Sequence, residues 1–82
     1  MSRQAKLDEV CKYRGLPPLK VGVECEVDGR NGIVVGGNCS ANLSVVFDDA
    51  DHVTNCHPGY RMRIFNGLGG DGVCYESEDL YA

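Results

Sequence analysis

No hydrophobic run in this sequence approaches the about 20 residues that a membrane-spanning helix requires. The first residues also lack the apolar segment of a secretory signal peptide, so we expect a cytoplasmic protein. The length of 82 residues excludes a separate cofactor domain and a doubly wound sheet. We therefore expect one small domain that binds no cofactor.

A surplus of basic residues is also missing. Eight lysines and arginines face twelve aspartates and glutamates, which gives a net charge of −4 and an isoelectric point of about 4.9. The bases gather in residues 1–20, whereas residues 67–82 carry acids and no base. Proteins that bind duplex nucleic acid usually have a basic face, so this charge disfavours general nucleic-acid binding.

The cysteines lack the pairing that disulfides or zinc sites use. Their number is five, which is odd, and no two have C-x-x-C spacing. Cys56 and His57 are adjacent, and adjacent strand residues point to opposite faces, so they are unsuited to share a metal or to act as nucleophile and base. Cys39 with either histidine lacks a third supporting residue. We expect reduced, unmetallated thiols and no enzymatic activity.

Residues 3–14 show helical periodicity. Ser2 is a good N-cap, and Gly15 followed by two prolines ends the pattern. The side chains spaced for one narrow face are Leu7, Val10, Cys11 and Arg14. We predict a helix over residues 3–14 that docks on the rest of the chain, because about three turns alone are only marginally stable in water.

After residue 20 the hydrophobic period changes from about 3.6 to 2, which is typical of strands. Five strands are predicted, at 21–27, from 33 onward, at 43–47, around 52–56 and at 61–65. The residues predicted to face inward on the first and third strands are Val21, Val23, Cys25, Val27, Leu43, Val45 and Phe47. The D-G and N-G pairs of residues 28–32 indicate a turn, Gly36-Gly37 indicates a bulge, and residues 57–60 indicate a single helical turn.

Five short strands joined by tight turns are typical of a small closed β-barrel. The segments G-V-E-C-E-V-D-G-R-N-G-I-V-V and S-V-V-F-D-D resemble SH3-like barrels of the KOW or Tudor type. The resemblance covers residues 20–66 and implies a mainly β fold, a five-stranded SH3-like barrel with one N-terminal α-helix. Residues 1–19 then form the helix and a proline linker. Residues 67–82 form a glycine-rich linker and an acidic tail. For residues 73–82, disorder and an added edge strand are both open.

Short polar side chains concentrate in residues 38–42 and 55–58. On an SH3-like barrel, the loop after the second strand and the turn before the last strand approach one another. We expect a binding rim there, formed by Asn38, Asn42, Asn55, His57 and Tyr60. Alternatively, the asparagines only satisfy backbone groups of turns. Two roles are likewise open for the tyrosine, as an exposed anchor for a partner or as a core residue.

Two further binding candidates, Arg61 and Arg63, share the outer face of the last predicted strand. They either contact the phosphates of a nucleic acid or nucleotide, or pair with Glu24 and Glu26. Ion pairing is the simpler explanation, because it needs no ligand.

The strings V-D-G-R-N-G-I-V-V-G-G-N-C-S-A-N-L-S-V-V-F-D-D and N-C-H-P-G-Y-R-M-R-I-F resemble small accessory proteins of tailed bacteriophages and prophages. The resemblance covers residues 3–66 and implies a protein of the bacterial cytoplasm that acts on a host component, with no catalytic residue transferred. We expect a non-enzymatic module that binds a host or phage protein. The alternative is nucleic-acid or nucleotide binding through the basic helix with Arg61 and Arg63. The oligomeric state stays open.

Overall fold

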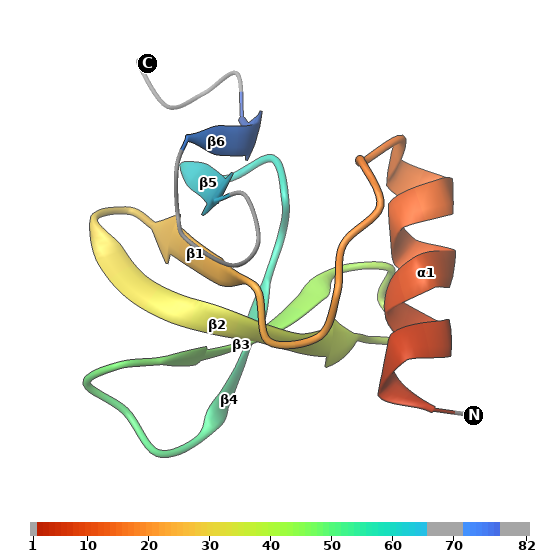
Figure 1. The fold of residues 1–82 in the computed structure, drawn as a ribbon. Coiled ribbons are helices and arrows are strands. Elements are labelled where there is room, and N and C mark those ends of the chain that lie inside the picture. Colours follow the sequence, from red (N-terminus) through yellow and green to blue (C-terminus); the bar gives the residue numbers. More distant parts are fainter. Residues whose placement is uncertain (1, 66–71, 78–82) are drawn as a thin grey trace.

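A computed structural model describes residues 2–65 and 72–77, and it is mainly β (Figure 1). One helix, α1 (Arg3–Arg14), precedes the strands. The strands are β1 (Glu24–Val27), β2 (Arg30–Gly37), β3 (Leu43–Phe47), β4 (Val53–Cys56), β5 (Met62–Phe65) and β6 (Val73–Glu76). They form one antiparallel sheet in the order β4-β3-β2-β1-β5-β6. Within the described residues, no helix is long and apolar enough to cross a membrane.

The predicted helix is confirmed with its bounds. The side chain of Ser2 accepts a hydrogen bond from the Ala5 N–H at 3.1 Å, and Gly15 ends the helix in the left-handed conformation, with φ 70°. The buried side chains of the helix are Leu7, Val10 and Cys11. The helix stands beside the end of β2 (Figure 1). There Gly37 permits a close approach, since a Cβ at this position would lie 2.6 Å from Val10 Cγ2.

The alternation predicted for the strands is confirmed for most positions and wrong for one. The predicted inward residues of β3 are all buried, and so are Cys25 and Val27 on β1. Val21 is 37 % exposed instead. The chain turns at Gly22, which has a φ of 101°, so the regular strand begins only at Glu24.

The β1–β2 turn uses only the first of the two predicted turn pairs. Asp28 and Gly29 both have positive φ, 52° and 83°, and form a two-residue hairpin connection. Gly32 lies inside β2 instead, where a Cβ would come within 2.7 Å of the Val46 carbonyl oxygen. The predicted bulge is confirmed, because the β2–β3 register shifts between Val34 and Gly36.

The predicted five-stranded barrel is wrong, because the described residues form six strands in an open sheet. Strand β5 pairs with β1 on one side and with β6 on the other, so its second edge is not available to β4. The tail therefore contributes an edge strand at Val73–Glu76, and the sheet continues past residue 66, the expected end of the barrel. The rest of the predicted linker and tail, residues 66–71 and 78–82, lies outside the described residues.

The core is one cluster of buried side chains from α1, the segment after it, and strands β1 to β5. Its fully buried members are Leu7, Cys25, Val34, Leu43, Val45, Met62 and Ile64. Because strands β1 to β5 all contribute side chains to this cluster, it defines the inner face of the sheet. The opposite, outer face carries the surfaces considered next.

Candidate binding surface

Three asparagines of the predicted rim come together at the β2–β3 loop. The Asn38 side-chain Nδ2 donates to Asn55 Oδ1 on β4 at 2.9 Å. The Asn38 Oδ1 accepts from the backbone N–H groups of Ser40 and Asn42, at 3.0 and 3.2 Å. We name Asn38, Asn42 and Asn55 the amide corner. The hydrogen bonds of Asn38 stabilise the turn, which is the role predicted as the alternative to ligand binding. The Asn55 side chain remains exposed on the outer face of the sheet.

The last residue of the helix holds the amide corner in place. Arg14 Nη2 donates to Asn42 Oδ1 at 3.0 Å, and Arg14 Nε donates to the Ala41 carbonyl oxygen at 2.8 Å. Ala41 has a φ of 58°, a left-handed conformation that these bonds help to fix. The corner is therefore ordered before any partner arrives, which lowers the entropy cost of binding.

The other two rim residues, His57 and Tyr60, lie on the turn between β4 and β5. His57 Nδ1 accepts from the Gly59 N–H at 2.9 Å, and the Tyr60 N–H donates to the His57 carbonyl oxygen at 3.0 Å. The Tyr60 side chain is 51 % exposed, so it does not fill the core. The aromatic ring packed on the core near this turn is that of Tyr75, whose hydroxyl donates to the Pro58 carbonyl oxygen at 2.7 Å.

The two candidate arginines are surrounded by carboxylates. Arg63 lies between Glu26 and Glu76, with closest nitrogen–oxygen distances of 3.6 and 3.3 Å. Arg61 lies 3.6 Å from a carboxylate oxygen of Asp28. The predicted ion pairing is therefore confirmed for Glu26 and wrong for Glu24. The other partners are Asp28, on the turn between β1 and β2, and Glu76 on β6. These carboxylates screen the positive charge that a phosphate would need.

The thiols divide into buried and accessible ones. Cys11, Cys25 and Cys56 are buried, Cys74 is half-buried, and Cys39 is exposed. Burial raises the pKa of Cys25 to about 12 and also raises the pKa values of Cys11 and Cys56, which makes these thiols poor nucleophiles. Residues 2–65 and 72–77 contain no group of three or more side chains that could hold a metal ion.

An apolar row that the sequence did not single out crosses the outer face of β2, β3 and β4. Ile33 pairs directly with Val46, which pairs directly with Val53. Ile33 is 38 % exposed and Val53 58 % exposed. We name these three residues the outer apolar row. The signal was present, because three consecutive apolar residues, Ile33 to Val35, cannot all face inward on a strand of period 2.

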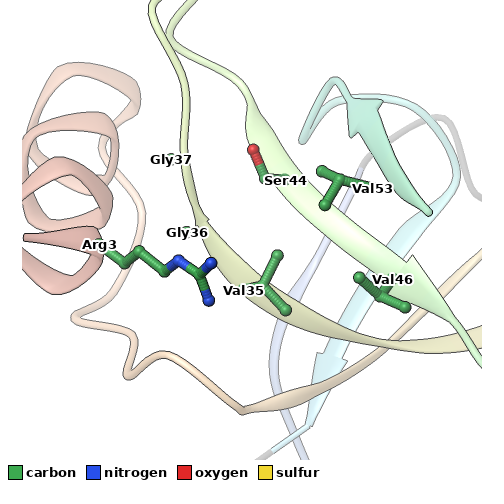
Figure 2. Close-up of a pocket in the computed structure, with 7 residues that line it drawn as sticks. All are labelled: Arg3, Val35, Gly36, Gly37, Ser44, Val46 and Val53. Carbon is green, nitrogen blue, oxygen red and sulfur yellow. The ribbon is translucent and has the colours of Figure 1, made fainter. Parts of the chain in front are cut away.

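Two hollows adjoin this row. The first, of about 310 Å³, is lined by Val46 and Val53 of the row, by Val35, Gly36, Gly37 and Ser44, and by Arg3 of α1. In Figure 2 the Arg3 side chain extends from the helix over this hollow toward Val35. The second hollow, of about 260 Å³, is lined by Ile33 and by the acidic residues Glu24 and Asp48, together with Cys25, Asn31, Gly32 and Phe65. The two hollows follow one another along β2, one near each end of the strand.

Comparison with models of known protein families, with curated proteins and with solved structures finds no match to this chain. A functional hypothesis therefore depends on the residues themselves.

Proposed function

We propose that this chain is a non-enzymatic protein-binding module, whose contact surface is the outer apolar row with the amide corner beside it. The observation that carries the proposal is the row itself, which is in register across three strands, with Ile33 and Val53 exposed and Val46 half-buried between them. Contiguous exposed apolar side chains commonly mark interaction sites. Asn55 borders the row from the same face, since it lies two residues beyond Val53 on β4. An apolar centre with a polar border is the usual composition of a protein–protein contact.

The proposed partner is a host protein of the bacterial cytoplasm, whose action the chain modifies or inhibits. This part of the proposal depends on the resemblance to bacteriophage accessory proteins. The net charge of −4 favours a partner with a basic surface, because complementary charge speeds encounter.

Nucleic-acid binding is the rival function, and the charges around Arg61 and Arg63 count against it. Two guanidinium groups face three carboxylates there, from Asp28, Glu26 and Glu76. In the basic helix, Arg14 is engaged by the loop that it holds.

A matched pair of exposed valines tests the proposal. Val53 on β4 belongs to the row, whereas Val73 on β6 is 41 % exposed on the other edge strand. The tagged full chain is incubated with bacterial lysate, and bound proteins are quantified by mass spectrometry. We expect Val53→Lys to lose the partner and Val73→Lys to keep it. Equal retention by both variants, or binding of labelled DNA or RNA that weakens with salt, would refute the proposal.

Tyr60 belongs to neither the row nor the corner, so it tests separately whether the contact extends to the rest of the predicted rim, where it is the expected anchor. Because half of its side chain is exposed, Tyr60→Ala should weaken partner binding by about 2 kcal/mol and leave the melting temperature almost unchanged. Calorimetric titration measures the first quantity and thermal unfolding the second. A large loss of thermal stability would assign the residue to packing instead.

A further inference from the structure

The two edge strands of the described sheet, β4 and β6, differ in how they are protected. Proteins usually guard a sheet edge against further pairing with a charge, a proline or a bulge. β6 carries a charge in Glu76, and its register with β5 shifts between Ile64 and Phe65. β4 reads V-T-N-C, without a charge or a proline, and its pairing with β3 has no shift. The outer edge of β4 is therefore open to another strand.

The β2–β3 ladder fixes which backbone groups of β4 face this open edge. The Asp48 N–H donates to the Asn31 carbonyl oxygen at 2.9 Å, so these two residues form a hydrogen-bonded pair. Hydrogen-bonded and non-hydrogen-bonded pairs alternate along an antiparallel ladder. The next hydrogen-bonded pair is therefore Ile33 with Val46, and Val46 directs its backbone N–H and C=O toward β2.

The neighbouring residue on β3, Val45, directs its backbone groups the other way, toward its partner Thr54 on β4. Val53 and Asn55, which flank Thr54, therefore direct their N–H and C=O groups away from β3. Within the described residues, no hydrogen bond outside the sheet ladders reaches these four groups. They form a set of two donors and two acceptors that another strand can satisfy.

This open edge continues the outer apolar row. Val53 is the last member of the row, so a residue directly opposite it on an added strand would extend the row on the same face. Two residues before Val53, Asp51 has a fully exposed side chain. It has no lysine or arginine as an ion-pair partner within the described part of the chain. This end of β4 therefore favours a basic residue from a partner.

We infer that the partner protein adds an extended segment to β4 as a further, antiparallel strand. The inference rests on the proposed function and specifies its partner. Every ladder of the described sheet is antiparallel, and this direction lets one partner residue exchange both of its hydrogen bonds with Val53. From its N-terminus, the segment has a polar residue opposite Asn55, a β-branched apolar residue opposite Val53 and a basic residue opposite Asp51. Main-chain hydrogen bonds supply affinity, and these alternate side chains supply specificity.

Selection from a library of random linear peptides tests this motif. The peptides are displayed on yeast and sorted on the full chain. We expect enrichment of valine or isoleucine followed two positions later by lysine or arginine. Asp51→Lys should replace the enriched base by an acid. Glu9→Lys makes the same charge change at an exposed position of α1, so it should select the original motif.

Backbone methylation of a selected peptide distinguishes strand pairing from other modes of binding. The peptide residue opposite Val53 donates its N–H to the Val53 carbonyl oxygen, so N-methylation there should weaken binding about tenfold in fluorescence anisotropy. The next peptide residue directs its N–H away from β4, so its methylation should change the affinity little. An equal loss at both positions would overturn the inference.

Two variants of Asn55 test the same edge from the side of the protein. Asn55→Pro and Asn55→Ala both remove the side-chain amide, but only the proline also removes an N–H from the open edge. We expect Asn55→Pro to bind a selected peptide about tenfold more weakly than Asn55→Ala does. The proline variant should still fold, because this N–H takes no part in the β3–β4 ladder. Equal affinities would contradict the inference, and if the proline variant does not fold, the methylation result decides.

The outcomes separate this inference from the function on which it rests. If selected peptides lose affinity for Val53→Lys but methylation shows no alternation, the inference is wrong and the proposed surface stands. The same conclusion follows if no peptide is enriched while a lysate partner responds to Val53→Lys. If methylation alternates but Val53→Lys retains the lysate partner, strand pairing stands and the proposed function is wrong. If sedimentation shows a dimer that Asn55→Pro dissociates, a second copy occupies the edge and both proposals are wrong.

Discussion

The outer face of the sheet carries two rows of three residues, one on each half. On β1, β5 and β6 the row is Glu26, Arg63 and Glu76, and on β2, β3 and β4 it is Ile33, Val46 and Val53. Both rows consist of directly opposed residues on neighbouring antiparallel strands. In the first row Arg63 lies between two carboxylates of the chain itself, whereas the second row leaves apolar side chains exposed to water.

The difference shows that the two halves of one sheet can have different roles: the charged row supports the fold, and the apolar row is exposed for contact with a partner. Cross-strand pairs contribute roughly 0.2–1 kcal/mol each, so the charged row adds modestly to the stability of the fold. Removing apolar surface from water stabilises a protein or complex by about 25 cal/mol per Å². The exposed part of the outer apolar row does not contribute this free energy to folding. That free energy is available to a partner.

The largest expected effect compares the inner face with the apolar row. Ile64 on β5 is fully buried, so Ile64→Ala should lower the free energy of unfolding by about 2–5 kcal/mol. Val53→Ala should change it by less than about 0.5 kcal/mol, because this valine supports little of the fold. Urea unfolding measures both. A loss of similar size for both variants would show that the apolar row is structural and break the comparison.

Raising the pH tests whether the Cys25 thiol is buried in the core, as its raised pKa requires. Cys25 on β1 and Cys56 on β4 come from different halves, and burial raises the pKa of both, that of Cys25 to about 12. The folded pKa thus exceeds the unfolded value near 9.0, so the stabilisation is complete below that pH. It falls as the pH rises toward the folded pKa, by up to about 1.4 kcal/mol per pH unit and thiol.

Unfolding by urea at about pH 8 and about pH 10 measures this fall. The Cys25→Ala variant should lose less stability between these two pH values than the unmodified chain. Cys39→Ala, which removes an exposed thiol, should lose as much as the unmodified chain. Equal slopes for all three proteins would mean that the Cys25 thiol is accessible to solvent in the folded state.

The smallest expected effect sharpens the description of the charged row. Arg63→Gln leaves two facing carboxylates without their cation, and we expect a loss of about 1 kcal/mol in unfolding free energy that shrinks at high salt. Arg30→Gln breaks the exposed pair with Asp49 and also removes the guanidinium from the Phe47 ring, 4.0 Å from its centroid. We expect a loss of about 1 kcal/mol that changes less with salt than the loss for Arg63→Gln, because the ring contact is not an ion pair. If Arg63→Gln leaves the unfolding free energy unchanged, the charged row contributes nothing to stability. The two rows would then differ only in how well water solvates their side chains.

Local signals in the sequence are sufficient where the determinants are local. The helix is predictable with its bounds, because Ser2 and Gly15 act within one turn of its ends. The inward residues of β3 follow from strict alternation. The meeting of Asn38 with Asn55 is predicted from the resemblance to an SH3-like barrel and is found although the sheet is open, whereas the binding role of the rim stays a prediction.

Features that depend on register between distant strands are not predictable in this way. The outer apolar row exists only because β2 and β3 align Ile33 with Val46, and β3 and β4 align Val46 with Val53. No local pattern singles out Arg3, because its hollow is formed by strands far from it in sequence. The open sheet is not predictable from sequence for a similar reason. The free edge of β5 pairs with β6, a strand that follows a glycine-rich segment.

The β1–β5 ladder has a consequence for how this chain accepts insertions. It joins Cys25 with Ile64, while every other ladder among the described residues joins strands that are neighbours in sequence. The whole β2–β4 meander is therefore a loop closed at its base by this ladder. Each doubling of a flexible loop costs only about 0.6 kcal/mol in closure entropy. New sequence placed in the exposed turn between β3 and β4 would thus leave the base intact, which makes this half of the sheet a natural scaffold for diversification.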